Sequence, residues 1–261
     1  MGPTSRSRYG KRICDSAVIG ESQRLCYSAA IIMSQMPFLA PSPREGPCRW
    51  THVALRVRMA GTLNTCFAPP PREAAYAAQF LHLAVDAHLS GQRDAAEHFL
   101  RSADLPILRD WTESLWGRNS PHVVIGFRAP ETLIANRTPV RMPTASEKAD
   151  LHSRDGYHCR FCGLTAIRAE VRRRIVLAYP NAVGWGRTNA SQHAAFQAMW
   201  AQYDHLIPHC KGGDNGKDNI VVTCAPCNFA RMDYLMEEVG LLHPLLRPPV
   251  TSPWDGLERF R

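Results

Sequence analysis

The chain has 261 residues, of which 45% are hydrophobic and 21% are charged. This composition excludes a fully disordered chain, and no apolar run of about 18 residues is present that would cross a membrane. The formal net charge of +8 favours a polyanionic partner, but residues 1–58 carry +6 of it. The rest of the chain is nearly balanced, so local clusters have to identify the partner.

Residues 1–58 mix Arg, Ser, Pro and Cys without a sustained helical or strand pattern. One interpretation is a basic arm that contacts nucleic acid. The other is a disordered or misassigned leader, with the true start near Met59. The missing pattern favours the leader.

Residues 68–117 predict a small helical unit with helices over 72–89, 93–103 and 107–116. The apolar positions expected to face the core in the first of these are Tyr76, Phe80, Leu83 and Ala87. Residues 118–146 contain four prolines and indicate a linker, with one short strand over 123–127. A helix over 147–154 then leads into the cysteine-rich part of the chain.

Nine cysteines are present, and an odd number does not indicate a disulfide framework. Four of them form two C-x-x-C pairs, Cys159 with Cys162 and Cys224 with Cys227. Two such pairs predict a four-thiolate structural zinc site, and the lack of an export signal predicts a cytoplasmic protein. Two unrelated reduced pairs remain the alternative. A redox motif is disfavoured because neither pair lies in a strand-helix-strand pattern.

Between the pairs, the residues from Tyr203 predict a strand, and a loop rich in Gly, Asp and Asn leads to a second strand over 220–223. A helix is expected over 228–239, ended by Gly240. The order is strand, loop, strand, cysteine pair, helix.

These residues resemble the HNH endonuclease family. The matching positions, within roughly 90 of the 261 residues, are Asp204-His205-x-x-Pro208, Gly212-Gly213, Asn219 and the final C-x-x-C followed by Asn228. The resemblance implies a ββα-metal finger that hydrolyses phosphodiester bonds in DNA with one divalent cation. The expected fold class is therefore α+β, with the small helical unit followed by a zinc-braced nuclease module over 147–240.

The resemblance also assigns roles. His205 would be the general base, Asn219 would orient its ring, and Asp204 and Asn228 would hold the cation. Histidine suits the first role because it exchanges protons near neutral pH. Many members carry His where this chain has Asn228, so the motif is a His-Asn-Asn variant, which favours a hard cation such as Mg²⁺. The alternative role for Asn228 is that of a helix N-cap.

An inserted helical segment over 164–202 separates the first cysteine pair from the motif, with helices expected over 166–178 and 191–202. Its aromatic residues are expected in the core. Basic residues that could contact DNA phosphates, or simply form a solvated face, are Arg168, Arg172, Arg173 and, in the hairpin loop, Lys211. Residues 241–261 are expected to wrap back as an irregular tail.

The sequence thus predicts a metal-dependent DNA endonuclease with structural Zn²⁺, catalytic Mg²⁺ or another divalent cation, DNA as partner and no membrane association. The alternative is a non-catalytic zinc module that binds nucleic acid. Oligomeric state and cleavage specificity stay open.

Overall fold

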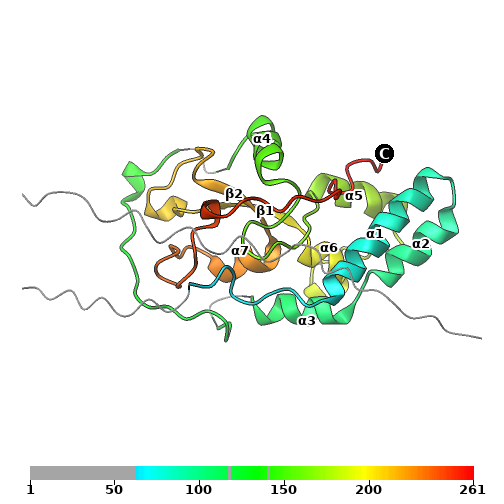
Figure 1. Cartoon of the computed structure of the whole chain (residues 1–261), viewed down its shortest axis with the longest axis horizontal. Coiled ribbons are helices and arrows are strands. Elements are labelled where there is room, and N and C mark those ends of the chain that lie inside the picture. Colours follow the sequence, from blue (N-terminus) through cyan, green and yellow to red (C-terminus); the bar gives the residue numbers. More distant parts are fainter. Residues whose placement is uncertain (1–62, 117–118, 140–141) are drawn as a thin grey trace, which may run out of the picture. The chain divides into compact units, whose positions relative to one another are not determined.

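The computed structural model describes residues 63–116, 119–139 and 142–261. They lie within one compact unit, Val57–Arg261, and the leader expected over 1–58 lies outside the described residues. The fold is α+β, with helices around a two-stranded sheet (Figure 1). No helix in the described ranges is long and apolar enough to span a bilayer.

The helical unit is confirmed. It consists of α1 (Glu73–Leu89), α2 (Arg93–Ser102) and α3 (Pro106–Ser114). The face that α1 buries differs from the expected one. It carries small residues and two larger ones, namely Ala74, Ala77, Leu81, Ala84, Val85 and Ala87, whereas Tyr76 is 55% exposed. The small alanine side chains allow α1 to pack closely on α2, and a side chain as large as Tyr76 would hold the two helices farther apart.

The strand-strand-helix order is also present. Strand β1 (Ala201–His205) pairs antiparallel with β2 (Ile220–Cys224), so that Asp204 lies opposite Val221. Helix α7 (Ala225–Arg231) follows directly, with a proline in its first turn. The expected helix over 228–239 was wrong, because α7 begins and ends earlier. Met232 adopts a left-handed φ of 50°, which ends the helix.

The remaining helices are α4 (Ala145–Asp155), α5 (Ala169–Ala178) and the short α6 (Ala194–Ala198), with 3₁₀ turns at Ile134–Asn136, Asn189–Ser191, His209–Lys211 and Pro244–Leu246. A capping box between Thr144 and Glu147 starts α4. The helix expected over 191–202 was wrong in its bounds, because α6 begins at Ala194 and ends at Ala198, and the chain enters β1 at Ala201. No strand forms over 123–127, a segment that the structure describes fully.

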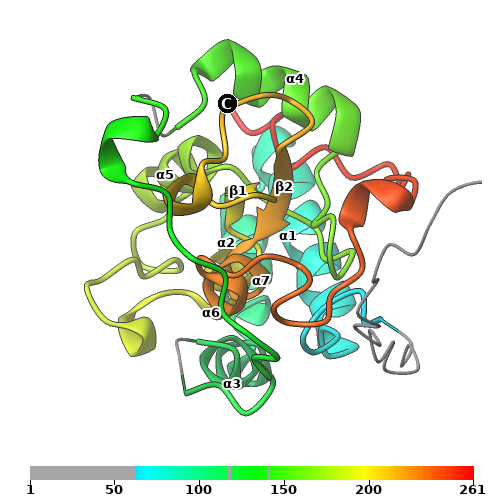
Figure 2. The same ribbon diagram turned by 90° about the vertical axis from the view of Figure 1, so that its left-hand side faces the viewer.

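One hydrophobic core joins the helical unit to the strand-strand-helix segment. Helix α3 packs against both α6 and α7, as Figure 2 shows at the lower side of the view, while α4 covers β2. The tail returns to the core as expected, since Leu257 and Phe260 are buried. The strand-strand-helix segment is therefore held by helices that lie far from it in sequence.

Candidate functional site

The four paired cysteines converge. Their Sγ atoms, from Cys159, Cys162, Cys224 and Cys227, all lie within 4.8 Å of one another. The Sγ atoms of Cys162 and Cys224 are 3.6 Å apart. A tetrahedral zinc ion with Zn–S bonds of about 2.3 Å needs sulfur atoms about 3.8 Å apart, so this cluster could hold zinc.

Backbone contacts shape the first cysteine pair. Gly163, with a φ of 79°, closes a tight turn in which its N–H donates to the carbonyl of Cys159 at 2.9 Å. The guanidinium of Arg247 donates to the carbonyls of Arg160 and Phe161 at 2.6 and 3.0 Å. The backbone of the second pair is held by regular secondary structure, because Cys224 ends β2 and Cys227 lies in α7. A metal here would tie the first pair to the hairpin.

The thiols are suited to share negative charge. Burial opposes ionisation at Cys159, yet hydrogen bonds from the three other thiols lower its pKa well below the usual value. Burial raises the pKa of the Cys224 thiol. A buried thiolate among thiols is the arrangement that a cation stabilises.

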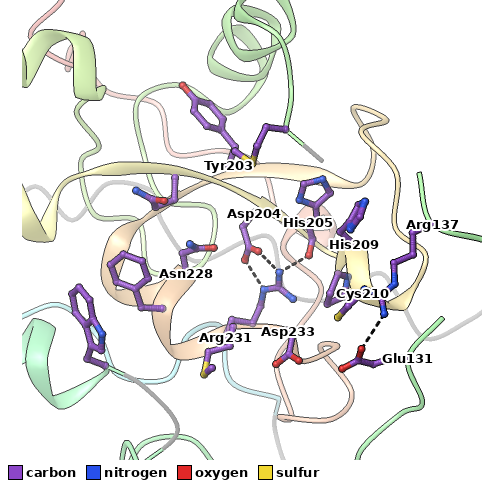
Figure 3. A pocket seen from close by; sticks show the side chains of 16 residues that line it. Glu131, Arg137, Tyr203, Asp204, His205, His209, Cys210, Asn228, Arg231 and Asp233 are labelled. Carbon is purple, nitrogen blue, oxygen red and sulfur yellow. Dashed lines mark hydrogen bonds and ion pairs between the residues drawn. The ribbon is translucent and has the colours of Figure 1, made fainter. Parts of the chain in front are cut away.

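A second site lies in a cavity of about 640 Å³. Asp204 and His205 from β1 line it together with Asn228 from α7 (Figure 3). The Asn228 amide extends toward the Asp204 carboxylate, whereas the His205 ring extends to the opposite side of the strand. That alternation is what neighbouring residues of a strand require.

Asp204 is engaged by an arginine that the motif did not indicate. Its Oδ2 accepts from Nε of Arg231 at 2.5 Å, and its Oδ1 accepts from the NH2 group of the same guanidinium. Both side chains are buried, with Arg231 1% and Asp204 4% exposed. Burial raises the pKa of Asp204, and the Arg231 guanidinium opposes that rise. A cation at Asp204 would therefore share the carboxylate with Arg231.

The partner of the His205 ring is Asn215, whose Oδ1 lies 2.9 Å from Nε2. With the amide oxygen as acceptor, Nε2 carries the ring hydrogen, and Nδ1 is left with the lone pair. The expected contact from Asn219 to the ring was wrong. Its Oδ1 accepts from the N–H of Ile207 at 2.8 Å, and its Nδ2 donates to the carbonyl of Asp214 at 2.8 Å.

Asn219 thus ties the two ends of the hairpin loop together. Gly213 is required in the same place, because a Cβ there would lie 1.8 Å from the carbonyl oxygen of Ile207. The glycine and asparagine of the motif act on the loop backbone, and the loop in turn presents Asn215 to His205.

Asn228 lies inside α7, whose N-cap is Cys224, so the capping role considered for Asn228 was wrong. Its side chain is half-buried and borders the cavity.

Two of the four basic residues expected at DNA are buried, and that expectation was wrong for them. Lys211 pairs with the fully buried Glu238, and the Lys211 side chain is 3% exposed. Arg172 lies between two tryptophan rings, 3.5 Å from the centroid of Trp185. Arg168 is partly exposed and pairs with Glu258 at 3.2 Å. Arg173 is exposed on α5.

The same cavity holds a second group that sequence reasoning missed, formed by Glu131, Cys210 and Asp233. Their ligand atoms lie within 4.8 Å of one another and could also hold a cation. Glu131 pairs with Arg137 at 3.0 Å and Asp233 with Arg128 at 2.5 Å. No pattern links a residue of the 118–146 segment to the hairpin loop, so only the tertiary structure reveals this group.

Arginines balance the carboxylates of the cavity. The charged side chains that line it, among the described residues, are Glu131, Asp204, Asp233, Arg137 and Arg231. Arg128 pairs with Asp233 as well, so each of the three carboxylates has an arginine partner, and a bound cation would share its carboxylate ligands with a guanidinium.

No family model, curated protein or solved structure matches this chain.

Proposed function

We propose that the chain is a metal-dependent DNA endonuclease of the HNH type. The observation that carries the proposal is that Asp204, His205 and Asn228, from a strand and the helix after the next strand, line one cavity beside a four-cysteine cluster. The connectivity β1, β2, α7 is that of the ββα-metal finger which the motif implies.

The donors fit a hard cation, because Asp204 and Asn228 both offer oxygen ligands. Bound there, the cation would offset negative charge on the phosphate and the leaving oxygen. His205 would accept a proton from water at Nδ1, while Asn215 holds Nε2. The water oxygen would bond to phosphorus as the bond from phosphorus to a sugar oxygen breaks. The leaving oxygen would take up a proton from solvent, and His205 would return its proton to solvent. The products are a terminal phosphate and a sugar hydroxyl.

For this chemistry the His205 ring has to face the phosphate. The residue is 8% exposed and borders the cavity, but its ring lies on the opposite side of β1 from the Asp204 carboxylate. Asn215 of the hairpin loop holds Nε2, so the ring would have to leave Asn215 in order to turn toward a cation at Asp204.

A non-catalytic zinc module that binds nucleic acid is the second candidate. It is favoured by the Arg231 guanidinium, which engages both oxygens of Asp204 and so competes with a cation. On this alternative the strand-strand-helix segment is a scaffold, and DNA would be bound without being cut.

The test is to incubate the full chain with supercoiled and linear DNA across Mg²⁺, Mn²⁺ and Zn²⁺. His205→Ala is expected to lower the cleavage rate by on the order of 10²–10⁴ and to leave zinc content and thermal unfolding nearly unchanged. His98→Ala, in α2 and away from the cavity, is the matched control. Cleavage by His205→Ala within a few-fold of the parent would refute the role of His205, and binding without cleavage by the parent would favour the second candidate.

A further inference from the structure

One end of the cavity is apolar and aromatic, and neither zinc binding nor hydrolysis uses it. Trp116 follows α3 and is 41% exposed, and Met142, which also lines the cavity, is 49% exposed. Phe229 is the residue directly after Asn228 in α7. Aromatic surface thus borders the position where the cation and the scissile phosphate would lie.

The two rings already form part of a stack. The Trp116 and Phe229 centroids are 4.3 Å apart with an angle of 40° between the rings. Trp200 approaches Phe229 from behind at 6.5 Å and 76°, in an edge-to-face arrangement. The buried guanidinium of Arg172 lies 4.6 Å from the Trp200 centroid and completes the series. The Phe229 ring is therefore positioned by the Trp200 ring, and Trp116 is the exposed end of this series of rings.

We propose that Trp116 and Phe229 form a stacking platform for an unpaired nucleobase next to the phosphate that is cut. Every base has a π-face, so such a platform accepts any sequence and contributes affinity for each stacked base. A base inside a duplex has to leave its stack to reach a concave site. The inference rests on the proposed function and narrows it, because the substrate becomes DNA with unpaired bases, such as single strands or flaps.

Charge supports a base at this end. The carboxylates of the cavity belong to Asp204, Glu131 and Asp233, whereas Trp116, Phe229 and Met142 carry no formal charge. A neutral, flat base suits that surface, and the phosphate would lie at the carboxylate end with the cation.

Binding is measured in a His205→Ala background, so that no probe is cut. The probes are labelled single strands of about 12 nucleotides, a duplex of the same sequence, and a single strand with all bases removed. Trp116→Leu keeps an apolar side chain and loses the π-face, and Phe229→Leu does the same for the second ring. Tyr76→Leu, which alters an exposed aromatic residue on α1, is the control.

Trp116→Leu and Phe229→Leu are each expected to weaken single-strand binding about tenfold and duplex binding less than twofold. Tyr76→Leu should change neither. Without any aromatic substitution, the base-free strand should bind more weakly than the intact strand and should fail to quench tryptophan fluorescence. This comparison of the two strands does not depend on whether Trp116→Leu or Phe229→Leu folds.

Equal binding of intact and base-free strands, preference for the duplex, or no DNA binding at all would overturn the proposal. The two proposals fail separately. If the parent chain cuts no DNA with any cation but the stacking pattern holds, the nuclease function is wrong and the platform stands. If the parent cuts DNA but Trp116→Leu and the base-free strand behave like their controls, the platform is wrong and the nuclease stands.

Discussion

Replacing Arg231 by methionine tests whether the buried ion pair with Asp204 stabilises the strand-strand-helix segment. The guanidinium donates to both oxygens of Asp204, to the carbonyl of His205 and to the carbonyl of Tyr234. With Arg231 1% exposed, Arg231→Met leaves a buried carboxylate and two carbonyls without these donors. Breaking such a pair costs about 3–5 kcal/mol, a large part of a typical stability of about 5–15 kcal/mol.

Urea unfolding of the zinc-loaded chain measures the effect. At a slope of about 2 kcal/mol per molar urea, a loss of about 3–5 kcal/mol lowers the midpoint of Arg231→Met by about 1.5–2.5 M. Arg101→Met is the matched control, since Arg101 pairs with Glu97 on the exposed face of α2 and should lose less than about 1 kcal/mol. Asp204→Leu combined with Arg231→Met should recover at least about 1 kcal/mol, because no charge is left buried. A midpoint for Arg231→Met equal to that of Arg101→Met would refute the reasoning.

Three further predictions concern zinc, pH and the hairpin loop. One tightly held zinc ion per chain should survive dialysis. Cys224→Ser should lower the zinc content and unfold the hairpin region, because structural zinc supplies folding free energy. Freshly purified, folded protein without zinc would contradict this. Burial lowers the pKa of His193, so the unfolded chain takes up a proton at this residue that the folded chain does not. Stability should therefore fall as pH drops below about 6.5, by up to about 1.4 kcal/mol per pH unit for this residue until its folded pKa is reached, and His193→Asn should reduce that slope in urea unfolding measured from pH 7.5 to 5.5. An unchanged slope would show that His193 does not contribute. Asn219→Ala should cost about 1–2 kcal/mol and speed amide hydrogen exchange across the loop, because it removes hydrogen bonds to Ile207 and Asp214. Asn215→Ala should change the NMR chemical shift of His205 Nε2 and have a smaller effect on exchange, because Asn215 contacts that atom. The reverse order of these effects would restore Asn219 as the partner of the ring.

The sequence by itself determined the elements whose causes are local. The helical unit followed from apolar spacing, and the strand pair from the Gly-, Asp- and Asn-rich loop that connects its strands. A helix before the first cysteine pair was also expected, and α4 forms there. The two C-x-x-C pairs specified the cysteine cluster, because a spacing of two residues already places two thiols on one turn. These signals act over a few residues and need no knowledge of the rest of the fold.

The tertiary structure decided what depends on contacts between distant segments. Burial of α1 through its alanines, and of Arg172 between two tryptophans, was set by what packs against each helix. Asn215, to which the sequence analysis gave no role, contacts the His205 ring in place of Asn219, because a loop with several asparagines can satisfy its backbone in more than one way.

The same reason applies to the cavity itself. Arg231 lies 27 residues after Asp204, and the pair forms only because α7 folds back along β1. Trp116 comes from the helical unit, and it reaches Phe229 because α3 packs on α7. Local patterns specify which elements form, whereas side-chain partners across the core depend on packing, which no local pattern encodes.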